Sequence, residues 1–227
     1  MEKRLGGKKL LYGGVAATLG FWLSASGAMA LPTMQITDGI TTIIVDDMTD
    51  GVLDGIVHWD GTLGVFNFAM AAGTTKPQDG SAQYPMMHLN GFATTSDAGV
   101  FTVLFTETDF GPLNSGIGGF ISAMNGAGGL QSLDVYFDES NAAFGLGTQI
   151  ADINTINTSE IYTGIPAENP FSLTMVATMF LDDGTGSFDN TVDPVPEPAT
   201  MLLFGTGLVG LGAGLKRKGK ISADAAV

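Results

Sequence analysis

The chain has 227 residues, contains no cysteine and carries a formal net charge of −14 at pH 7. The lack of cysteine excludes disulfides, thiolate nucleophiles and cysteine-ligated zinc or iron–sulfur centres. Residues 31–194 hold 20 acidic residues and a single base, Lys76, so this region lacks the clustered Lys and Arg that nucleic acids require. Such a charge is compatible with divalent cations and with neutral or cationic polysaccharides.

The first 30 residues have the pattern of a secretory signal peptide. Basic residues precede an apolar segment, residues 10–23, and Ala28-Met29-Ala30 then matches the A-x-A cleavage pattern. Fourteen apolar residues are fewer than the roughly 20 that span a membrane, which disfavours a permanent N-terminal anchor. We therefore expect signal peptidase to recognise Ala28 and Ala30, and the exported chain to begin at Leu31.

Residues 31–194 have the length of one domain, and alternation of apolar and polar residues is their strongest pattern. In chain order, the runs that predict strands are residues 40–46, 55–59, 62–71, 85–94, 99–108, 130–140 and 171–183, of which the last three are clearest. Five Asp-Gly pairs predict turns, which commonly close hairpins, at residues 50–51, 54–55, 60–61, 79–80 and 183–184. The glycine-rich residues 116–129 fit either a flexible loop or a poorly patterned strand.

We predict an all-β domain, an antiparallel β-sandwich of the jelly-roll-like kind. Its expected core contains Phe66, Phe68, Phe101, Phe105 and Phe137.

Two acidic clusters are candidate calcium loops. In residues 46–55, acids stand at positions 1, 5 and 9 and Gly51 at position 6, but Met48 and Val57 occupy positions 3 and 12. The EF-hand pattern therefore fails, and only a different type of Ca²⁺ loop remains. The second cluster, residues 181–190, holds Asp182, Asp183 and Asp189. Because Asp also favours turns, we prefer that interpretation and expect no cofactor.

No catalytic motif stands out. The chain has neither a G-x-S-x-G elbow nor an H-E-x-x-H sequence, and its two histidines, His58 and His88, are expected to face solvent or to form hydrogen bonds. Acids are so numerous that no carboxylate pair is singled out for glycoside hydrolysis. We expect no enzymatic activity and keep an exported hydrolase as the remaining alternative. Trp59 and Tyr136 are candidates for stacking on sugars.

The C-terminal part has three segments in order. Val195-Pro196-Glu197-Pro198 precedes the uncharged residues 199–215, and the basic residues Lys216, Arg217, Lys218 and Lys220 follow. As a helix, residues 199–215 would extend about 25 Å, close to a hydrocarbon core of about 30 Å. The basic cap marks the cytoplasmic side, so we predict one transmembrane helix with the acidic domain outside. A plain anchor on a proline-rich stalk is the alternative, and residues 221–227 form a short tail.

These three segments resemble the PEP-CTERM sorting signal of Gram-negative bacteria. The resemblance covers residues 195–220 and implies recognition of Val195-Pro196-Glu197-Pro198 by an exosortase, a membrane peptidase thought to cleave near the Pro-Glu-Pro. It also implies that the precursor is anchored in the inner membrane. The product then reaches the cell surface or the exterior, often among exopolysaccharide.

The expected function is that of an exported cell-envelope or extracellular-matrix protein with a structural or interaction role. The alternative is a carbohydrate- or ice-binding module, since PEP-CTERM-type tails also occur on ice-binding proteins. Ice binding requires a flat, regular face rich in threonine, and the threonines of this sequence are scattered. Only the pairs Thr102/Thr106 and Thr174/Thr178 are expected to share a strand face.

Overall fold

The computed structural model describes residues 30–165 and 169–197, together with Leu203 and Thr206. Most of the predicted signal peptide, including Ala28, lies outside the described residues, as do Pro198, the basic cap and nearly all of the predicted transmembrane segment. Within the described part of the chain, no helix combines the length and the apolar character needed to cross a membrane.

The described residues form fourteen strands. They are β1 (Thr33–Thr37), β2 (Thr42–Asp46), β3 (Ile56–Leu63), β4 (Phe66–Thr74), β5 (Gly80–Ser81), β6 (Tyr84–Pro85), β7 (Met87–Thr95), β8 (Gly99–Phe110), β9 (Ile117–Ala127), β10 (Leu130–Asp138), β11 (Thr148–Ile153), β12 (Thr158–Thr163), β13 (Phe171–Leu181) and β14 (Gly184–Pro196).

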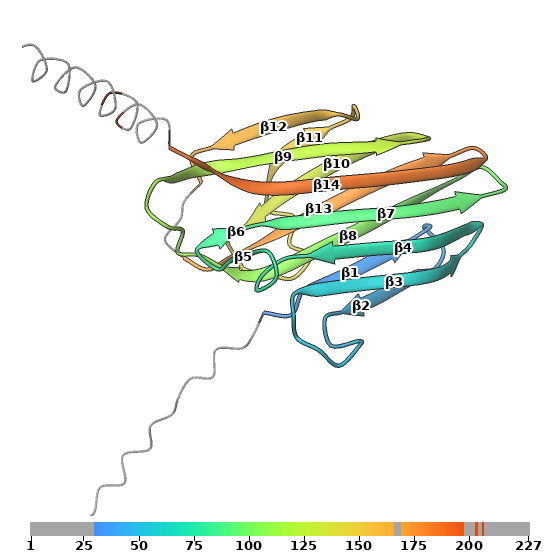
Figure 1. The fold of residues 1–227 in the computed structure, drawn as a ribbon, viewed down its shortest axis with the longest axis horizontal. Coiled ribbons are helices and arrows are strands. Elements are labelled where there is room, and N and C mark those ends of the chain that lie inside the picture. Colours follow the sequence, from blue (N-terminus) through green and yellow to red (C-terminus); the bar gives the residue numbers. More distant parts are fainter. Residues whose placement is uncertain (1–29, 166–168, 198–202, 204–205, 207–227) are drawn as a thin grey trace, which may run out of the picture.

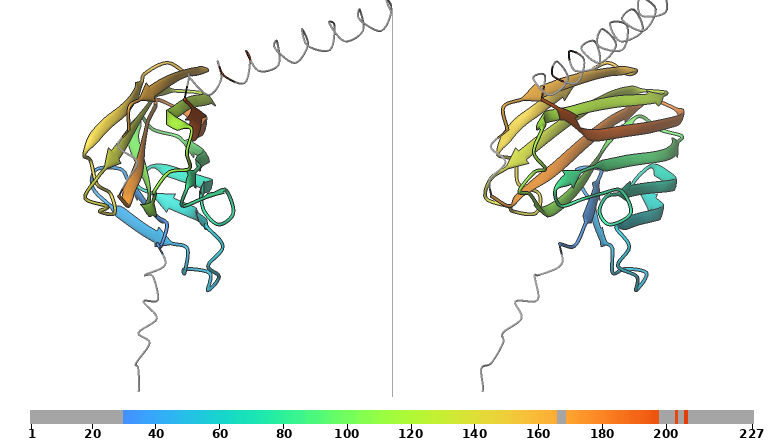
Figure 2. Two further views of the ribbon diagram at one scale, coloured as in Figure 1. Left: turned by 90° about the vertical axis from the view of Figure 1, so that its left-hand side faces the viewer. Right: turned by 60° about the vertical axis from the view of Figure 1, so that its left-hand side comes forward.

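Twelve of these strands build two antiparallel sheets of six. Sheet A has the order β11-β10-β13-β8-β1-β2, and sheet B has the order β12-β9-β14-β7-β4-β3. The sheets stack as two layers, with the small β5–β6 ribbon at one end (Figures 1 and 2). The predicted all-β antiparallel sandwich is therefore confirmed.

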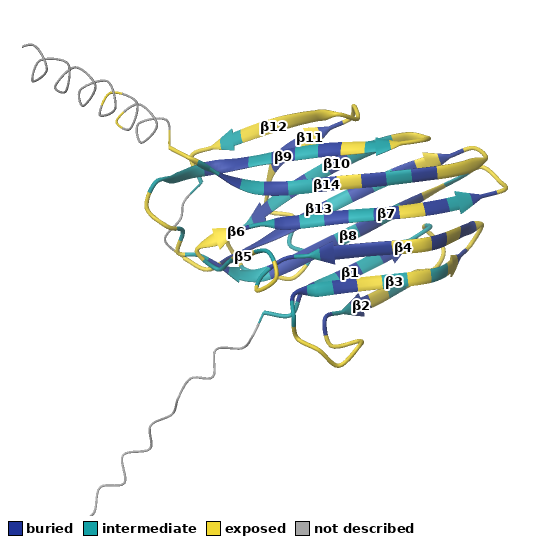
Figure 3. Ribbon diagram, viewed as in Figure 1, coloured by how far each residue is buried: buried dark blue, intermediate teal, exposed yellow. Residues whose placement is uncertain are grey.

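The core lies between the two sheets. Along most strands buried residues alternate with partly exposed ones, because successive side chains of a strand point to opposite faces (Figure 3). All five phenylalanines predicted for the core are buried. Phe101 meets the rings of Phe66 and Phe68 edge-on, with centroids 5.0 and 4.8 Å apart, and such pairs add about 0.5–1.5 kcal/mol to the effect of burial.

Two local predictions were wrong, and one predicted turn connects other strands than those of a hairpin. Residues 62–71 do not form one strand, because Gly64, with φ +57°, closes the β3–β4 hairpin. Asp60-Gly61 lies inside β3 at a register shift rather than in a turn. Asp183-Gly184 forms a turn, but this turn leads from β13 in sheet A to β14 in sheet B instead of closing a hairpin within one sheet.

The glycine-rich residues 116–129 contain strand β9. A Cβ atom on Gly119 would lie 1.9 Å from the carbonyl oxygen of Tyr162 on the neighbouring strand β12. Glycine is therefore required where β12 approaches β9. Because glycine has no side chain, it interrupts the alternation of apolar and polar residues from which a strand is predicted.

Candidate sorting site and binding surface

The predicted sorting motif begins inside the sandwich. Val195 and Pro196 are the last residues of β14 and pair with Gly119 and Ile117 of β9. The backbone N–H of Glu197 then donates a hydrogen bond to the carbonyl oxygen of Gly116 at 2.7 Å. Pro198 lies outside the described residues. Three of the four motif residues are thus attached to sheet B.

A row of hydroxyl side chains crosses the outer face of sheet A. Cross-strand register aligns one residue from each of five neighbouring strands, Ser132, Thr178, Thr102, Thr37 and Thr42. Within this hydroxyl row, Oγ1 of Thr102 lies 3.1 Å from Oγ1 of Thr178, and Thr42 donates to Thr37 at 3.1 Å. With strands about 4.8 Å apart, the row extends about 19 Å. The threonines that seemed scattered in the sequence are therefore regularly spaced in the fold.

The hydroxyl row has an apolar border on one side. Leu130, Phe180 and Val100 pair across β10, β13 and β8 and are 74%, 36% and 47% exposed. They lie two residues along their strands from the row, so their side chains share its face. The outer face of sheet A therefore presents a polar line beside an apolar one.

An acidic pair lies on the other side of the hydroxyl row. Asp134 of β10 pairs with Asp152 of β11, and Gln149 Nε2 donates to Asp134 at 2.8 Å. Burial raises the pKa of Asp134 above its usual value, and the neighbouring Asp152 raises it further. Tyr136, one of the two predicted stacking residues, lies on the same outer face beside these acids.

One threonine of each predicted pair, Thr106 and Thr174, is covered. Thr106 and Thr174 are fully buried, and the backbone N–H of Phe144 donates to Thr106 Oγ1 at 3.0 Å. Ser172 Oγ also donates to the carbonyl oxygen of Ala142 at 2.7 Å. The loop between β10 and β11 therefore covers this end of sheet A and leaves the hydroxyl row as the open part.

The aspartates of residues 46–55 bind backbone N–H groups. The buried carboxylate of Asp47 accepts from Gly55 at 2.9 Å and from Ile56 at 3.3 Å. Asp46 accepts from Met48 at 3.1 Å, and Asp50 accepts from Val52 at 2.9 Å. These bonds are those of aspartate-stabilised turns, as the turn interpretation predicted.

The aspartates of the second acidic cluster do not lie close to one another. Asp182 and Asp183 lie in the exposed turn before β14, whereas Asp189 lies roughly 20 Å further along that strand. Among the residues that the structure describes, no group of three or more His, Asp or Glu side chains is placed to hold a metal ion. Calcium binding by either cluster therefore stays an untested alternative to the turn interpretation.

The two histidines occupy outer strand positions, as expected. His58 is exposed on β3 and borders a surface hollow of about 180 Å³ with Asp46, Thr49, Asp50 and Ile56. His88 on β7 pairs through Nε2 with Asp189 on β14.

Trp59 packs against Phe68 with ring centroids 5.4 Å apart and belongs to the rim of the core. Its contact with the core argues against the predicted stacking of this ring on sugars.

A buried ion pair that sequence reasoning missed connects two parts of the fold. Lys76 Nζ lies 3.1 Å from Glu107 Oε1, with the two side chains 15% and 0% exposed. Lys76 also donates to the carbonyl oxygen of Thr108 and lies 4.4 Å from the ring centroid of Phe110. Burial raises the pKa of Glu107 to about 7, although Lys76 acts in the opposite direction. Because Glu107 has no exposed surface, the pair is structural.

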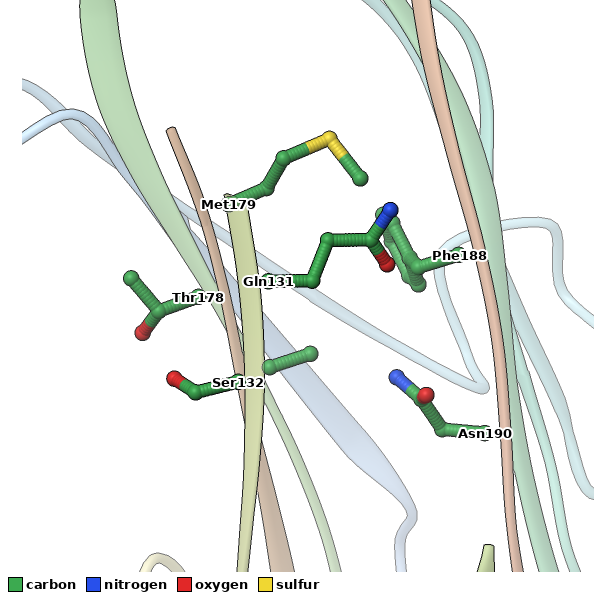
Figure 4. Close-up of a pocket in the computed structure, with 7 residues that line it drawn as sticks. Gln131, Ser132, Thr178, Met179, Phe188 and Asn190 are labelled. Carbon is green, nitrogen blue, oxygen red and sulfur yellow. The ribbon is translucent and has the colours of Figure 1, made fainter. Parts of the chain in front are cut away.

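A narrow space between the sheets contains buried amides (Figure 4). Gln131 and Asn190 point into it, whereas Ser132 and Thr178 point to the opposite side of sheet A, where the hydroxyl row lies. Asn190 is 1% exposed, and neither its Oδ1 nor its Nδ2 has a hydrogen-bond partner. The space is too narrow for a water molecule, so this amide remains unsatisfied.

Comparison with known proteins identifies the C-terminal segment. The family model of the PEP-CTERM protein-sorting motif matches residues 194–218. Comparison of the sequence with curated proteins finds no match. Among solved structures, the chain is similar to TmCBM61 in complex with β-1,4-galactotriose, with 10% identity and a TM-score of 0.31 over 60% of this chain and 92% of that chain. We assign neither fold nor ligand from this likeness.

Proposed function

Because the chain carries a PEP-CTERM protein-sorting motif, we propose that it is exported and anchored as a precursor by its C-terminal segment until an exosortase processes it. The mature β-sandwich then acts as a structural or interaction component of the cell envelope or extracellular matrix. The motif carries this proposal, and the strongly acidic sandwich and the lack of a catalytic sequence motif support a non-enzymatic role.

Replacing Pro196, Glu197 and Pro198 together with alanine is expected to abolish processing. The full chain is expressed in a host with an exosortase, and fractionation with mass spectrometry of the termini locates the product and both cleavage sites. The wild-type chain should appear as a shortened product outside the inner membrane, and the triple variant should stay in the membrane fraction. Unchanged processing and location of the triple variant would refute the sorting role.

A second candidate function is binding of a ligand with regularly repeated hydroxyl groups or water molecules, either a polysaccharide or ice. The hydroxyl row favours it, because five side chains that donate and accept hydrogen bonds repeat at the strand spacing beside the apolar border of Leu130, Phe180 and Val100. Exopolysaccharide would be the natural partner of a matrix protein.

Replacing Thr102 and Thr178 with valine removes two central hydroxyls and is expected to weaken binding at least tenfold, at about 1 kcal/mol per lost hydrogen bond. The double variant Thr62→Val and Thr163→Val, which changes exposed threonines of sheet B, is the matched control. Glycan-array binding and thermal hysteresis of the purified sandwich separate the two ligand classes. If the wild type is inactive in both assays, or if both double variants bind like it, the candidate is wrong.

A further inference from the structure

The end of β14 has backbone pairing with a neighbouring strand on one side only, although β6 lies close to β14. β14 pairs with β7 as far as Val192 and with β9 as far as Pro196. Beyond Val192, the chain that leads into the sorting motif therefore loses one of its two partner strands. Strand ends with few partners open at a lower free energy than the core of a sheet.

The prolines of this segment suit its one-sided pairing. Glu197 directs its N–H toward β9, and N–H groups of an extended strand alternate between its two sides. The backbone nitrogens of Pro194 and Pro196, which carry no hydrogen, therefore face the side on which β7 no longer pairs with β14. The segment consequently binds to β9 without leaving an unpaired N–H on its free side.

A glycine on β9 provides the space for Glu197. A Cβ atom on Gly118 would lie 2.8 Å from Cγ and 3.1 Å from Cα of Glu197. Any larger residue at this position therefore pushes Glu197 away from β9. The sequence of β9 thus permits a close contact with the sorting motif.

We propose that residues 195–197 exchange between a state docked on β9 and an undocked state, and that the exosortase acts only on the undocked state. This inference rests on the proposed function. A membrane peptidase must surround the backbone that it recognises, whereas in the docked state the N–H of Glu197 and one side of the strand are already occupied. When opening and closing are fast compared with cleavage, the rate of processing follows the population of the open state.

The first experiment moves the sorting motif away from β9 without changing the sequence of the motif. A Gly-Ser-Gly-Ser insertion between Asp193 and Pro194 of the full chain keeps residues 194–218 intact and moves them off their docking position. Loss of the docking contacts is expected to increase the rate of processing about 2- to 10-fold, the factor that one hydrogen bond contributes to an opening equilibrium. The same insertion in the exposed turn between Asp182 and Asp183 is the matched control and should leave the rate unchanged.

Pulse-chase labelling in the host with an exosortase measures these rates, and the triple alanine variant of the motif sets the unprocessed baseline. If the wild type is processed and the Asp193 insertion variant is processed at the same rate or more slowly, docking does not slow processing. The proposed sorting function is unaffected by that result. If neither the wild type nor the insertion variant is processed, the sorting function itself is wrong. Faster processing of the Asp193 insertion alone supports the inference.

A second measurement tests docking without the peptidase. Hydrogen exchange of the Glu197 amide in the full chain should be slow in the wild type and at least tenfold faster in Gly118→Val, while the amides of β13 keep their protection. Equal exchange of the Glu197 amide in both proteins would overturn the docked state, whatever the rate of processing.

Discussion

Replacing Lys76 with methionine is expected to lower the free energy of unfolding by about 3–5 kcal/mol at pH 8, because Glu107 must then either stay charged and buried without its partner or take up a proton. Methionine preserves most of the length of the side chain, so the loss reports the charge rather than a large cavity. Urea denaturation of the purified sandwich measures the effect. An exposed acid changed to its amide, Glu139→Gln, is the control and should alter stability by less than about 0.5 kcal/mol.

The cost of the Lys76 substitution should depend on pH. Burial raises the pKa of Glu107 from 4.5 to about 7, so the folded state favours the protonated carboxyl. The stability that this group contributes is therefore present below about pH 4.5 and is lost as the pH rises through 7. Without Lys76 the pKa rises further, and the variant should lose less stability at pH 5 than at pH 8.

The double variant Lys76→Met with Glu107→Leu distinguishes the loss of the ion pair from a simple packing defect. Removing both charges also removes the buried unpaired carboxylate, and such replacements are often neutral or stabilising. We expect the double variant to regain most of the stability lost in Lys76→Met. If the double variant is as unstable as the single one at every pH, the ion pair does not explain the loss.

Replacing Asn190 with leucine is expected to raise the free energy of unfolding by about 1–3 kcal/mol, because a buried amide without hydrogen bonds costs about this much. Leucine has nearly the same shape as asparagine, so its two methyl groups can take the places of the amide oxygen and nitrogen. Thermal and urea unfolding measure the change. Asn125→Leu, at an exposed position on the neighbouring strand β9, is the control and should have an effect within about 0.5 kcal/mol. A destabilised Asn190→Leu variant would mean that the amide has partners in solution.

The strands predicted best from the sequence were those with one regular apolar face. Residues 99–108, 130–140 and 171–183 alternate clearly and correspond to β8, β10 and β13, all in sheet A. The pattern fails where glycine and proline serve close contacts. Strand β9 contains Gly118 and Gly119, and β14 presents Asn190 and Pro194 on its inner face, so neither strand shows continuous apolar alternation.

The two candidate functional features differed in how far sequence alone could reveal them. The sorting motif is a linear signal, so its residues could be identified without a fold. The hydroxyl row depends on register between strands that are distant in the chain, since Thr37, Thr102 and Thr178 align only after β1, β8 and β13 pair. Docking of Glu197 on β9 likewise follows from the fold and from the geometry at Gly118.

The position of β14 also has a consequence for the timing of folding during export. In sheet B, β14 joins the pair β12-β9 to the group β7-β4-β3, so both parts lack a common neighbour until residues 184–196 arrive. These are the last strand residues of the described chain, and a channel that passes the N-terminus first delivers them after all the others. If the chain is exported in this direction, as proposed above, sheet B can be completed only after residues 184–196 have crossed, so the sandwich would close at the end of translocation.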